Sequence, residues 1–136
     1  MFISETTLRV RYAETDQMSY VYYGNYAQYY EVGRVEALRQ LGTTYRQLEE
    51  SGVMMPVVSM NINYKRPALY DDILTIKIII KELPTTKMRF EYEIYNQKGE
   101  LLNTAETVLV FVNRSNMRPC RCPQWFVDLF AITDLK

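Results

Sequence analysis

The chain contains no histidine, and this absence limits the chemistry that it can perform. Histidine is the usual base beside a nucleophilic serine or cysteine and a frequent metal ligand, so triads and metal sites that depend on it are excluded. Only two cysteines are present, Cys120 and Cys122, too few to close a zinc site. We therefore expect reduced thiols, no metal and no cofactor, with any reaction left to carboxylates, hydroxyls or backbone groups.

The chain also lacks an excess of charge and a long apolar run. Sixteen basic residues balance sixteen acidic residues, without the basic surplus typical of nucleic-acid-binding proteins. No apolar stretch is long enough to cross a bilayer, and the first residues do not resemble a signal peptide. We expect a cytoplasmic protein with one domain over residues 1–136 and no nucleic-acid partner. The zero net charge and twelve tyrosines favour a homo-oligomer, such as a dimer or a homotetramer.

The helical spacing of apolar residues predicts one long helix over residues 24–41. Gly33 lies on the apolar stripe of this helix, which indicates a close approach to a sheet. Arg34 is expected on a flank of the helix, where Glu31 can pair with it. Gly42 is expected to end the helix in a left-handed conformation.

Alternation of apolar and polar residues predicts strands over 3–12, 57–66, 73–83, 88–96 and 104–113. Short helices are predicted over 44–50 and from Pro123 onward. A helix with one apolar stripe needs one sheet face to cover it, so we expect an α+β fold in which an antiparallel sheet wraps the long helix. The other sheet face would stay semi-exposed, and oligomerisation would cover it.

Asp16 is the strongest candidate for a reactive group. It lies in the loop of residues 13–20, just before a tyrosine-rich helix whose first N–H groups are unpaired. A carboxylate can act as a nucleophile or as a general base, and the sequence leaves both roles open. Helix N-terminal N–H groups around Tyr23 and Gly24 can polarise a carbonyl oxygen.

Two motifs carry a resemblance to a known family. The first places a tyrosine four residues before an aspartate and continues into the helix as Tyr12, Asp16, Val21, Tyr22, Asn25, Tyr26 and Arg34. The second is VMMPVVSMNINYKRPALYDDILTI over residues 53–76. In this order and spacing the chain resembles the hotdog-fold acyl-CoA thioesterases, in the branch of 4-hydroxybenzoyl-CoA thioesterase and the Tol-Pal-associated enzymes.

The resemblance implies a hotdog fold, an acyl-CoA substrate with a short aliphatic or aromatic acyl group, and an active site at a subunit interface. It implies Asp16 as the catalytic group and the Tyr23 backbone N–H as the carbonyl donor. Tyr22, Tyr26 and Ser59 are expected near the acyl group. Basic residues are expected to meet the coenzyme A phosphates, with these candidates: Lys65, Arg66, Lys87, Arg89 and Arg118.

The chain departs from the family pattern at two places, and other functions stay open. Ser19 and Tyr20 follow Asp16 where the family has a glycine, and Tyr23 stands where many members have histidine. A bulky Tyr20 could block the acyl site, which would favour a non-catalytic hotdog module that binds an acyl carrier protein or an acyl ligand. A pocket beside Asp16 would discriminate between the two functions. Hotdog dehydratases typically need a histidine, which this chain lacks.

Overall fold

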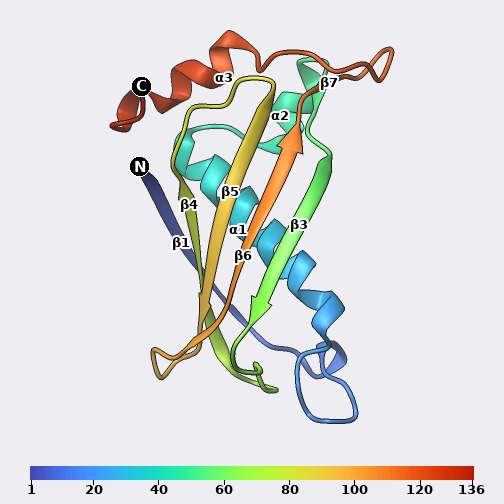
Figure 1. Cartoon of the computed structure of the whole chain (residues 1–136), viewed down its shortest axis with the longest axis vertical. Coiled ribbons are helices and arrows are strands. Elements are labelled where there is room, and N and C mark those ends of the chain that lie inside the picture. Colours follow the sequence, from blue (N-terminus) through green and yellow to red (C-terminus); the bar gives the residue numbers. More distant parts are fainter.

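A five-stranded antiparallel sheet wraps around one long helix in the computed structural model, which describes residues 1–136 (Figure 1). The strand order across the sheet is β1-β4-β5-β6-β3. The main elements are β1 (Phe2–Arg9), α1 (Tyr26–Leu41), β3 (Val57–Tyr64), β4 (Ile73–Ile80), β5 (Lys87–Tyr95) and β6 (Leu101–Val110). This arrangement confirms the α+β fold that the sequence predicts.

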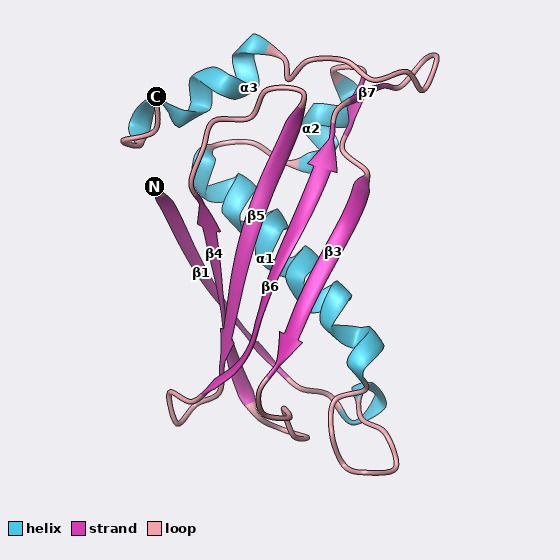
Figure 2. Cartoon of the chain, in the orientation of Figure 1, coloured by secondary structure: helices cyan, strands magenta, loops and turns pink.

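Smaller elements close the two ends of the sheet (Figure 2). They are α2 (Tyr45–Glu50), β2 (Val53–Met54), β7 (Val112–Asn113), α3 (Gln124–Asp128) and three 3-10 turns at Tyr12–Glu14, Tyr23–Asn25 and Leu129–Ile132. The sequence pattern predicts α2 and α3 but not the short β2–β7 pair, because two-residue strands carry too little periodicity. None of the helices combines the length and the apolar character needed to span a membrane.

The core lies between α1 and the inner face of the sheet. The inward side chains of β4 and β5 alternate with exposed or half-exposed ones, as their period of two requires. Fully buried examples are Leu74, Ile76, Ile78 and Ile80 on β4 and Phe90 on β5. The helix contributes its stripe of tyrosines and small residues to the same core.

Two glycines of the helix region have the roles that the sequence predicts. A Cβ atom added to Gly33 would lie 2.7 Å from Ile78 Cδ1 and 2.8 Å from Ile76 Cγ2, so only glycine allows α1 to approach β4 this closely. Gly42 has a φ of 102° and ends α1 in the left-handed region. Together these residues set how near α1 lies to the sheet and where it stops.

Two predicted boundaries are wrong by a few residues near the Asp16 loop. The first strand ends at Arg9 rather than at residue 12, because Arg11 and Glu14 cap a 3-10 turn that takes the chain away from the sheet. The long helix begins at Tyr26, and a 3-10 turn precedes it. Both changes lengthen the irregular segment that carries Asp16.

The expectation that Arg34 lies on a flank of the helix and pairs with Glu31 is wrong. Arg34 is buried, and its guanidinium donates hydrogen bonds to the hydroxyls of Tyr45 at 3.2 Å and Tyr92 at 3.0 Å. Burial lowers the pKa of Arg34, but its interactions with Tyr92 and Tyr45 outweigh this effect and the pKa is raised overall. The side chain therefore ties α1 to α2 and β5 from the inside of the fold.

Candidate active site

Asp16 sits in an exposed turn that its own carboxylate stabilises. Its Oδ1 atom accepts hydrogen bonds from the backbone N–H groups of Met18 at 2.8 Å and Tyr20 at 3.4 Å. The Asp16 N–H donates to the Tyr20 carbonyl at 2.8 Å, which closes the turn. No hydrogen bond engages Oδ2, so one carboxylate oxygen is fixed and the other is open for chemistry.

Ser19 adopts the backbone conformation that a glycine would otherwise provide in this turn. Its φ is 68°, in the left-handed region that glycine adopts most easily. Its N–H donates to the Asp16 carbonyl at 3.0 Å. The serine therefore takes up the conformation of a glycine, and the turn keeps its tight path.

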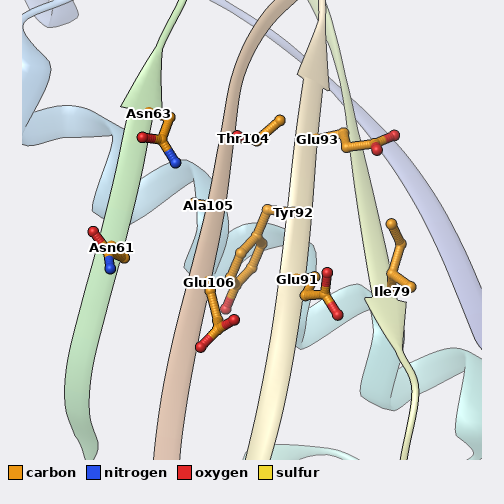
Figure 3. A pocket seen from close by; sticks show the side chains of 9 residues that line it. All are labelled: Asn61, Asn63, Ile79, Glu91, Tyr92, Glu93, Thr104, Ala105 and Glu106. Carbon is orange, nitrogen blue, oxygen red and sulfur yellow. The ribbon is translucent and has the colours of Figure 1, made fainter.

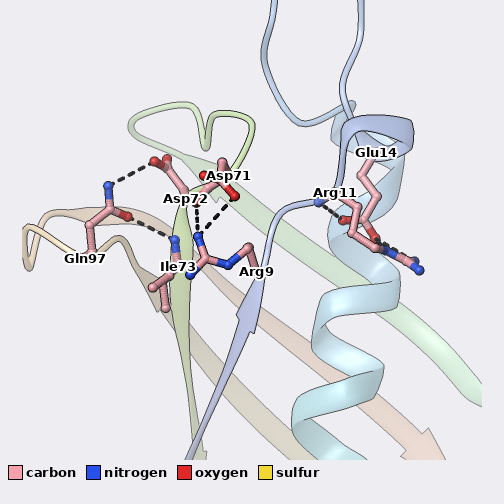
Figure 4. A network of polar contacts seen from close by, with 7 residues as sticks. All are labelled: Arg9, Arg11, Glu14, Asp71, Asp72, Ile73 and Gln97. Atoms are coloured by element: carbon pink, nitrogen blue, oxygen red, sulfur yellow. Dashed lines mark hydrogen bonds and ion pairs between the residues drawn. The ribbon is translucent and has the colours of Figure 1, made fainter.

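Glu14 anchors the Asp16 loop to the helix, and the sequence pattern does not identify it. Figure 4 shows its contacts with Arg11. The buried carboxylate accepts from the Arg11 backbone N–H at 2.8 Å and from the Arg11 guanidinium at 3.0 Å. It also accepts from the Tyr29 hydroxyl of α1 at 3.0 Å. Burial raises the pKa of Glu14, but these hydrogen bonds outweigh burial and hold the pKa below its usual value. The spacing of Arg11 and Glu14, as a turn cap, is the signal that could have identified this residue.

The segment after β3 forms the other wall of the site. Val21 N–H donates to the Ala68 carbonyl at 2.8 Å, and Ala68 N–H donates to the Tyr26 hydroxyl at 3.3 Å. Further along this segment, Arg9 donates to Asp71 at 3.1 Å and Gln97 donates to Asp72 at 3.0 Å (Figure 4). The contacts of Ala68 hold the loop between β3 and β4 against the segment that follows the Asp16 turn, and the contacts of Asp71 and Asp72 fix it to β1 and to the turn between β5 and β6.

A cavity of about 290 Å³ lies between the Asp16 turn, the start of α1 and the end of β3. Its lining residues are Asp16, Tyr20, Val21, Tyr23, Tyr26, Tyr64, Lys65, Arg66 and Pro67. A second hollow of about 610 Å³ is lined by Tyr12, Thr15, Asp16, Gln17, Ser19, Leu69 and Tyr70. Asp16 is the one residue that lines both. Tyr20 contributes to the wall of the first cavity and does not seal it.

Free backbone donors lie at the helix end of the cavity. The N–H groups of Tyr23 and Gly24 donate no hydrogen bond within the chain, while the next N–H, from Asn25, donates to the Tyr22 carbonyl at 2.8 Å. A Cβ atom at Gly24 would lie 2.6 Å from Tyr22 Cε2, so the Tyr22 ring covers this glycine closely. The start of the helix region therefore presents two unused donors of the kind that polarise a carbonyl, and one of their residues, Tyr23, lines the same cavity as Asp16.

The structure brings together some of the predicted site residues and separates others. Asp16, Tyr23, Tyr26, Lys65 and Arg66 line the same cavity. Tyr64, Tyr20, Val21 and Pro67 line it too and are not among the predicted site residues, although Tyr64 directly precedes the predicted basic pair. The ring of Tyr22 packs against that of Tyr23 with centroids 4.8 Å apart, but Tyr22 does not line the cavity.

The remaining predicted residues lie elsewhere in the chain. Ser59 pairs with Val108 on the sheet face turned away from α1. Lys87 pairs with Val110, at the opposite end of the sheet from Tyr64, and Arg89 follows on the same strand. Arg118 lies beyond β7, where its carbonyl accepts from Asn113 N–H at 2.8 Å. Within one chain, these four residues do not share the Asp16 cavity.

Another hollow, on the outer sheet face, holds three glutamates (Figure 3). Glu91 and Glu106 are directly opposite each other on β5 and β6, an unfavourable pairing unless cations compensate. Lys81 pairs with Glu91 at 3.1 Å, Lys77 with Glu93 at 3.8 Å, and Arg89 with Glu106. Because each carboxylate has a cationic partner, this hollow is a weaker candidate for chemistry than Asp16.

Comparison with known proteins gives consistent relationships over nearly the whole chain. The model of the thioesterase-like superfamily matches residues 10–130. The chain is 38% identical over 128 residues to YneP of Bacillus subtilis, with 94% of this chain and 93% of that protein covered. It is 34% identical over 123 residues to the acyl-CoA thioester hydrolase YbgC of Escherichia coli, covering 90% of this chain and 92% of that protein.

Solved structures agree with the sequence relatives. The fold is similar to that of the DHNA-CoA thioesterase from Staphylococcus aureus, with a TM-score of 0.89 and 36% sequence identity. This similarity covers 94% of the present chain and 86% of the other one.

Proposed function

This chain belongs to the thioesterase-like superfamily, and from that premise we propose that it is an acyl-CoA thioesterase in which Asp16 carries the reaction. One observation supports the assignment above others: Asp16, whose Oδ2 atom is free of hydrogen bonds, and Tyr23, whose N–H is unused, line the same cavity. Relatives named acyl-CoA thioester hydrolase and DHNA-CoA thioesterase support a coenzyme A thioester as the substrate.

The chemistry requires only groups that line the cavity or directly follow a residue that lines it. The thioester carbonyl binds with its oxygen toward the N–H groups of Tyr23 and Gly24, which stabilise the negative charge that develops on it. Asp16 either attacks the carbonyl carbon, giving an anhydride that water cleaves, or removes a proton from an attacking water. The coenzyme A thiolate leaves without needing a strong general acid, which explains how a protein without histidine can catalyse the step.

The basic residues at the cavity and the cavity volume indicate where the carrier and the acyl group of the substrate bind. Lys65 and Arg66 border the cavity and provide positive charge for the coenzyme A phosphates. Arg66 also pairs with Glu100 at 3.2 Å, which leaves Lys65 as the less engaged of the two. The cavity volume of about 290 Å³ suits a short aliphatic or aromatic acyl group.

The edge strand β3 supports assembly into a homo-oligomer. It lies at one end of the sheet, and its exposed apolar side chains are Val57, Val58, Met60 and Tyr64. An unpaired apolar edge favours pairing with another chain. We propose that a second copy pairs here, and that basic residues outside the cavity of one chain, such as Lys87, Arg89 and Arg118, serve the coenzyme A site of its partner.

The alternative of a non-catalytic module that binds an acyl carrier protein is less well supported. That function would be favoured by a site sealed by Tyr20, and Tyr20 instead lines an open cavity beside Asp16. The hydrolytic function therefore accounts for more of the observed geometry.

The test is hydrolysis of a panel of acyl-CoA esters, from short aliphatic to aromatic, followed by release of the free thiol. We expect Asp16→Asn to reduce kcat/KM at least ~100-fold, about 2.7 kcal/mol of transition-state stabilisation. Asp128→Asn, on the remote and exposed α3, is the matched control and should leave the rate unchanged. Activity that survives in Asp16→Asn would refute the role of Asp16, and the absence of activity on every ester would refute the function.

A further inference from the structure

Ser19 holds a strained backbone conformation three residues after Asp16, where a glycine would be free of strain. Its φ of 68° lies in the left-handed region, which Asn and Asp adopt more readily than other residues with side chains. Strained residues of this kind cluster at functional sites. Compared with glycine, serine adds a single hydroxyl group to the turn, so the hydroxyl is the feature to account for.

The Ser19 hydroxyl is not used to hold the turn together. The backbone N–H of Ser19 donates to the Asp16 carbonyl at 3.0 Å, whereas its Oγ atom makes no hydrogen bond within the chain. The neighbouring hydroxyl of Thr15, by contrast, donates to the Tyr12 carbonyl at 2.7 Å. The Ser19 hydroxyl is therefore available to a molecule that enters from solvent.

Ser19 and Asp16 line the same hollow of about 610 Å³. The Asp16 carboxylate is fixed through Oδ1, while Oδ2 accepts no hydrogen bond. Ser19 Oγ and Asp16 Oδ2 do not bond to each other, so both are open to a third partner. Gln17 also lines this hollow with a free amide, but its longer side chain would lose more rotamer freedom in holding a small molecule.

We propose that Ser19 positions the hydrolytic water for Asp16. The water donates one hydrogen bond to Asp16 Oδ2 and the other to Ser19 Oγ, which leaves its lone pairs free for the carbonyl carbon. A water held by the carboxylate alone would turn about that single contact and attack less often in the right orientation. This inference rests on the proposed function, and it takes Asp16 as the general base of that reaction.

The step that Ser19 assists is the attack of water on the thioester. The water oxygen forms a bond to the carbonyl carbon while one of its protons passes to Asp16 Oδ2. The C–S bond then breaks, and the proton on Asp16 passes to the departing coenzyme A thiolate, which leaves Asp16 ionised for the next turnover. Ser19 neither gains nor loses a proton, so its effect is on orientation and should appear in kcat rather than in KM.

Three substitutions at this position separate the hydroxyl from the turn conformation. Ser19→Ala removes the hydroxyl and keeps the strain, Ser19→Gly removes both, and Ser19→Asn keeps a polar group on a residue that tolerates the left-handed region. With the acyl-CoA ester that the wild type hydrolyses fastest, kcat should fall roughly tenfold in Ser19→Ala and in Ser19→Gly, with KM little changed. Ser19→Asn should recover part of the loss, and Gln17→Ala, in the same hollow, should leave kcat unchanged.

The glycine variant keeps the test decisive, because relief of strain favours its folding. A lower kcat in a protein that unfolds at higher urea concentration cannot result from a damaged turn. If only the turn conformation mattered, Ser19→Gly would match or exceed the wild-type kcat. That result would overturn the role of Ser19, and so would an equal loss in Gln17→Ala.

Coupling between Ser19 and Asp16 provides a second measurement. Because the water acts through Asp16, Ser19→Ala should cause little further loss of kcat in Asp16→Asn protein. A further tenfold loss there would show that Ser19 acts independently of Asp16, against the inference. Wild-type kcat in Ser19→Ala and Ser19→Gly, with the loss in Asp16→Asn intact, would refute the inference and leave the thioesterase function standing. If the wild type hydrolyses no ester, the inference fails together with the proposed function.

Discussion

The Glu14 carboxylate accepts a hydrogen bond from the Tyr29 hydroxyl at 3.0 Å, and this contact joins the loop that carries Asp16 to α1. Glu14 also receives the Arg11 backbone N–H, and its own carbonyl accepts from Tyr22 N–H at 2.9 Å and from Asn25 Nδ2 at 2.9 Å. One buried residue thus fixes both the approach to the reactive turn and the start of the helix. The position of Asp16 relative to the Tyr23 N–H depends on it.

The lowered pKa of Glu14 predicts a loss of stability in acid. A group whose pKa is lower in the folded than in the unfolded chain stabilises the fold above its unfolded value, here 4.5, and that contribution is lost as the pH falls through the folded pKa. We expect the unfolding free energy, measured by urea titration, to decrease as the pH is lowered from 7 to below 4.5. Glu14→Gln should lower the stability at pH 7 and weaken this pH dependence, whereas Glu49→Gln on the exposed face of α2 should do neither. An identical acid slope in Glu14→Gln and wild type would contradict the assignment.

The left-handed conformation of Ser19 predicts that glycine is the better residue there. Ser19→Gly should raise the unfolding free energy by about 1 kcal/mol, because glycine adopts a φ of 68° without strain. Ser19→Val should lower both stability and kcat, since a β-branched residue resists this conformation and would distort the Asp16 turn. Gln17→Gly in the same loop is the control and should be destabilising. Urea midpoints and thioesterase rates would decide, and stabilisation by Ser19→Val would be inconsistent with the geometry.

The close approach of α1 to β4 predicts that Gly33→Ala is destabilising. Alanine normally favours a helix interior by about 1 kcal/mol over glycine. At this position its Cβ would meet Ile78 Cδ1 at 2.7 Å, so we expect a net loss of roughly 1–3 kcal/mol in unfolding free energy. Glu31→Ala, on the exposed face of the same helix, should have little effect. A more stable Gly33→Ala protein would show that the contact relaxes easily.

The charge at the cavity rim predicts a binding defect for Lys65→Ala. Steady-state kinetics with an acyl-CoA ester should show KM raised roughly three- to tenfold with kcat nearly unchanged, because the lost contact acts on the bound carrier and not on the reacting carbonyl. The wild-type KM should also rise with ionic strength, and less steeply in the variant. Lys98→Ala, on an exposed hairpin turn, provides the comparison. A fall in kcat at constant KM would place Lys65 in the chemical step instead.

The sequence predicts the features that depend on neighbouring residues and misses those that depend on distant ones. The strands, α1 and the Gly42 cap follow from periodicity and from a local backbone requirement, and the Asp16 turn follows from a motif of contiguous residues. The sequence places Arg34 on a flank of the helix, because its burial depends on Tyr45 and Tyr92, which are 11 and 58 residues away along the chain. The contact between Tyr30 and Asn103 spans 73 residues and leaves no periodic trace. Such polar contacts between layers are set by the packing of α1 on the sheet.

The place of Asp16 between two hollows has a consequence for turnover. One side of the residue faces the cavity that holds Tyr23, Lys65 and Arg66, and the other side faces the hollow bordered by Tyr12 and Tyr70. Solvent can therefore reach Asp16 without crossing the space that an acyl group and its carrier would fill. If the ester occupies the first cavity, as proposed, the second hollow offers hydrolytic water a separate route to Asp16.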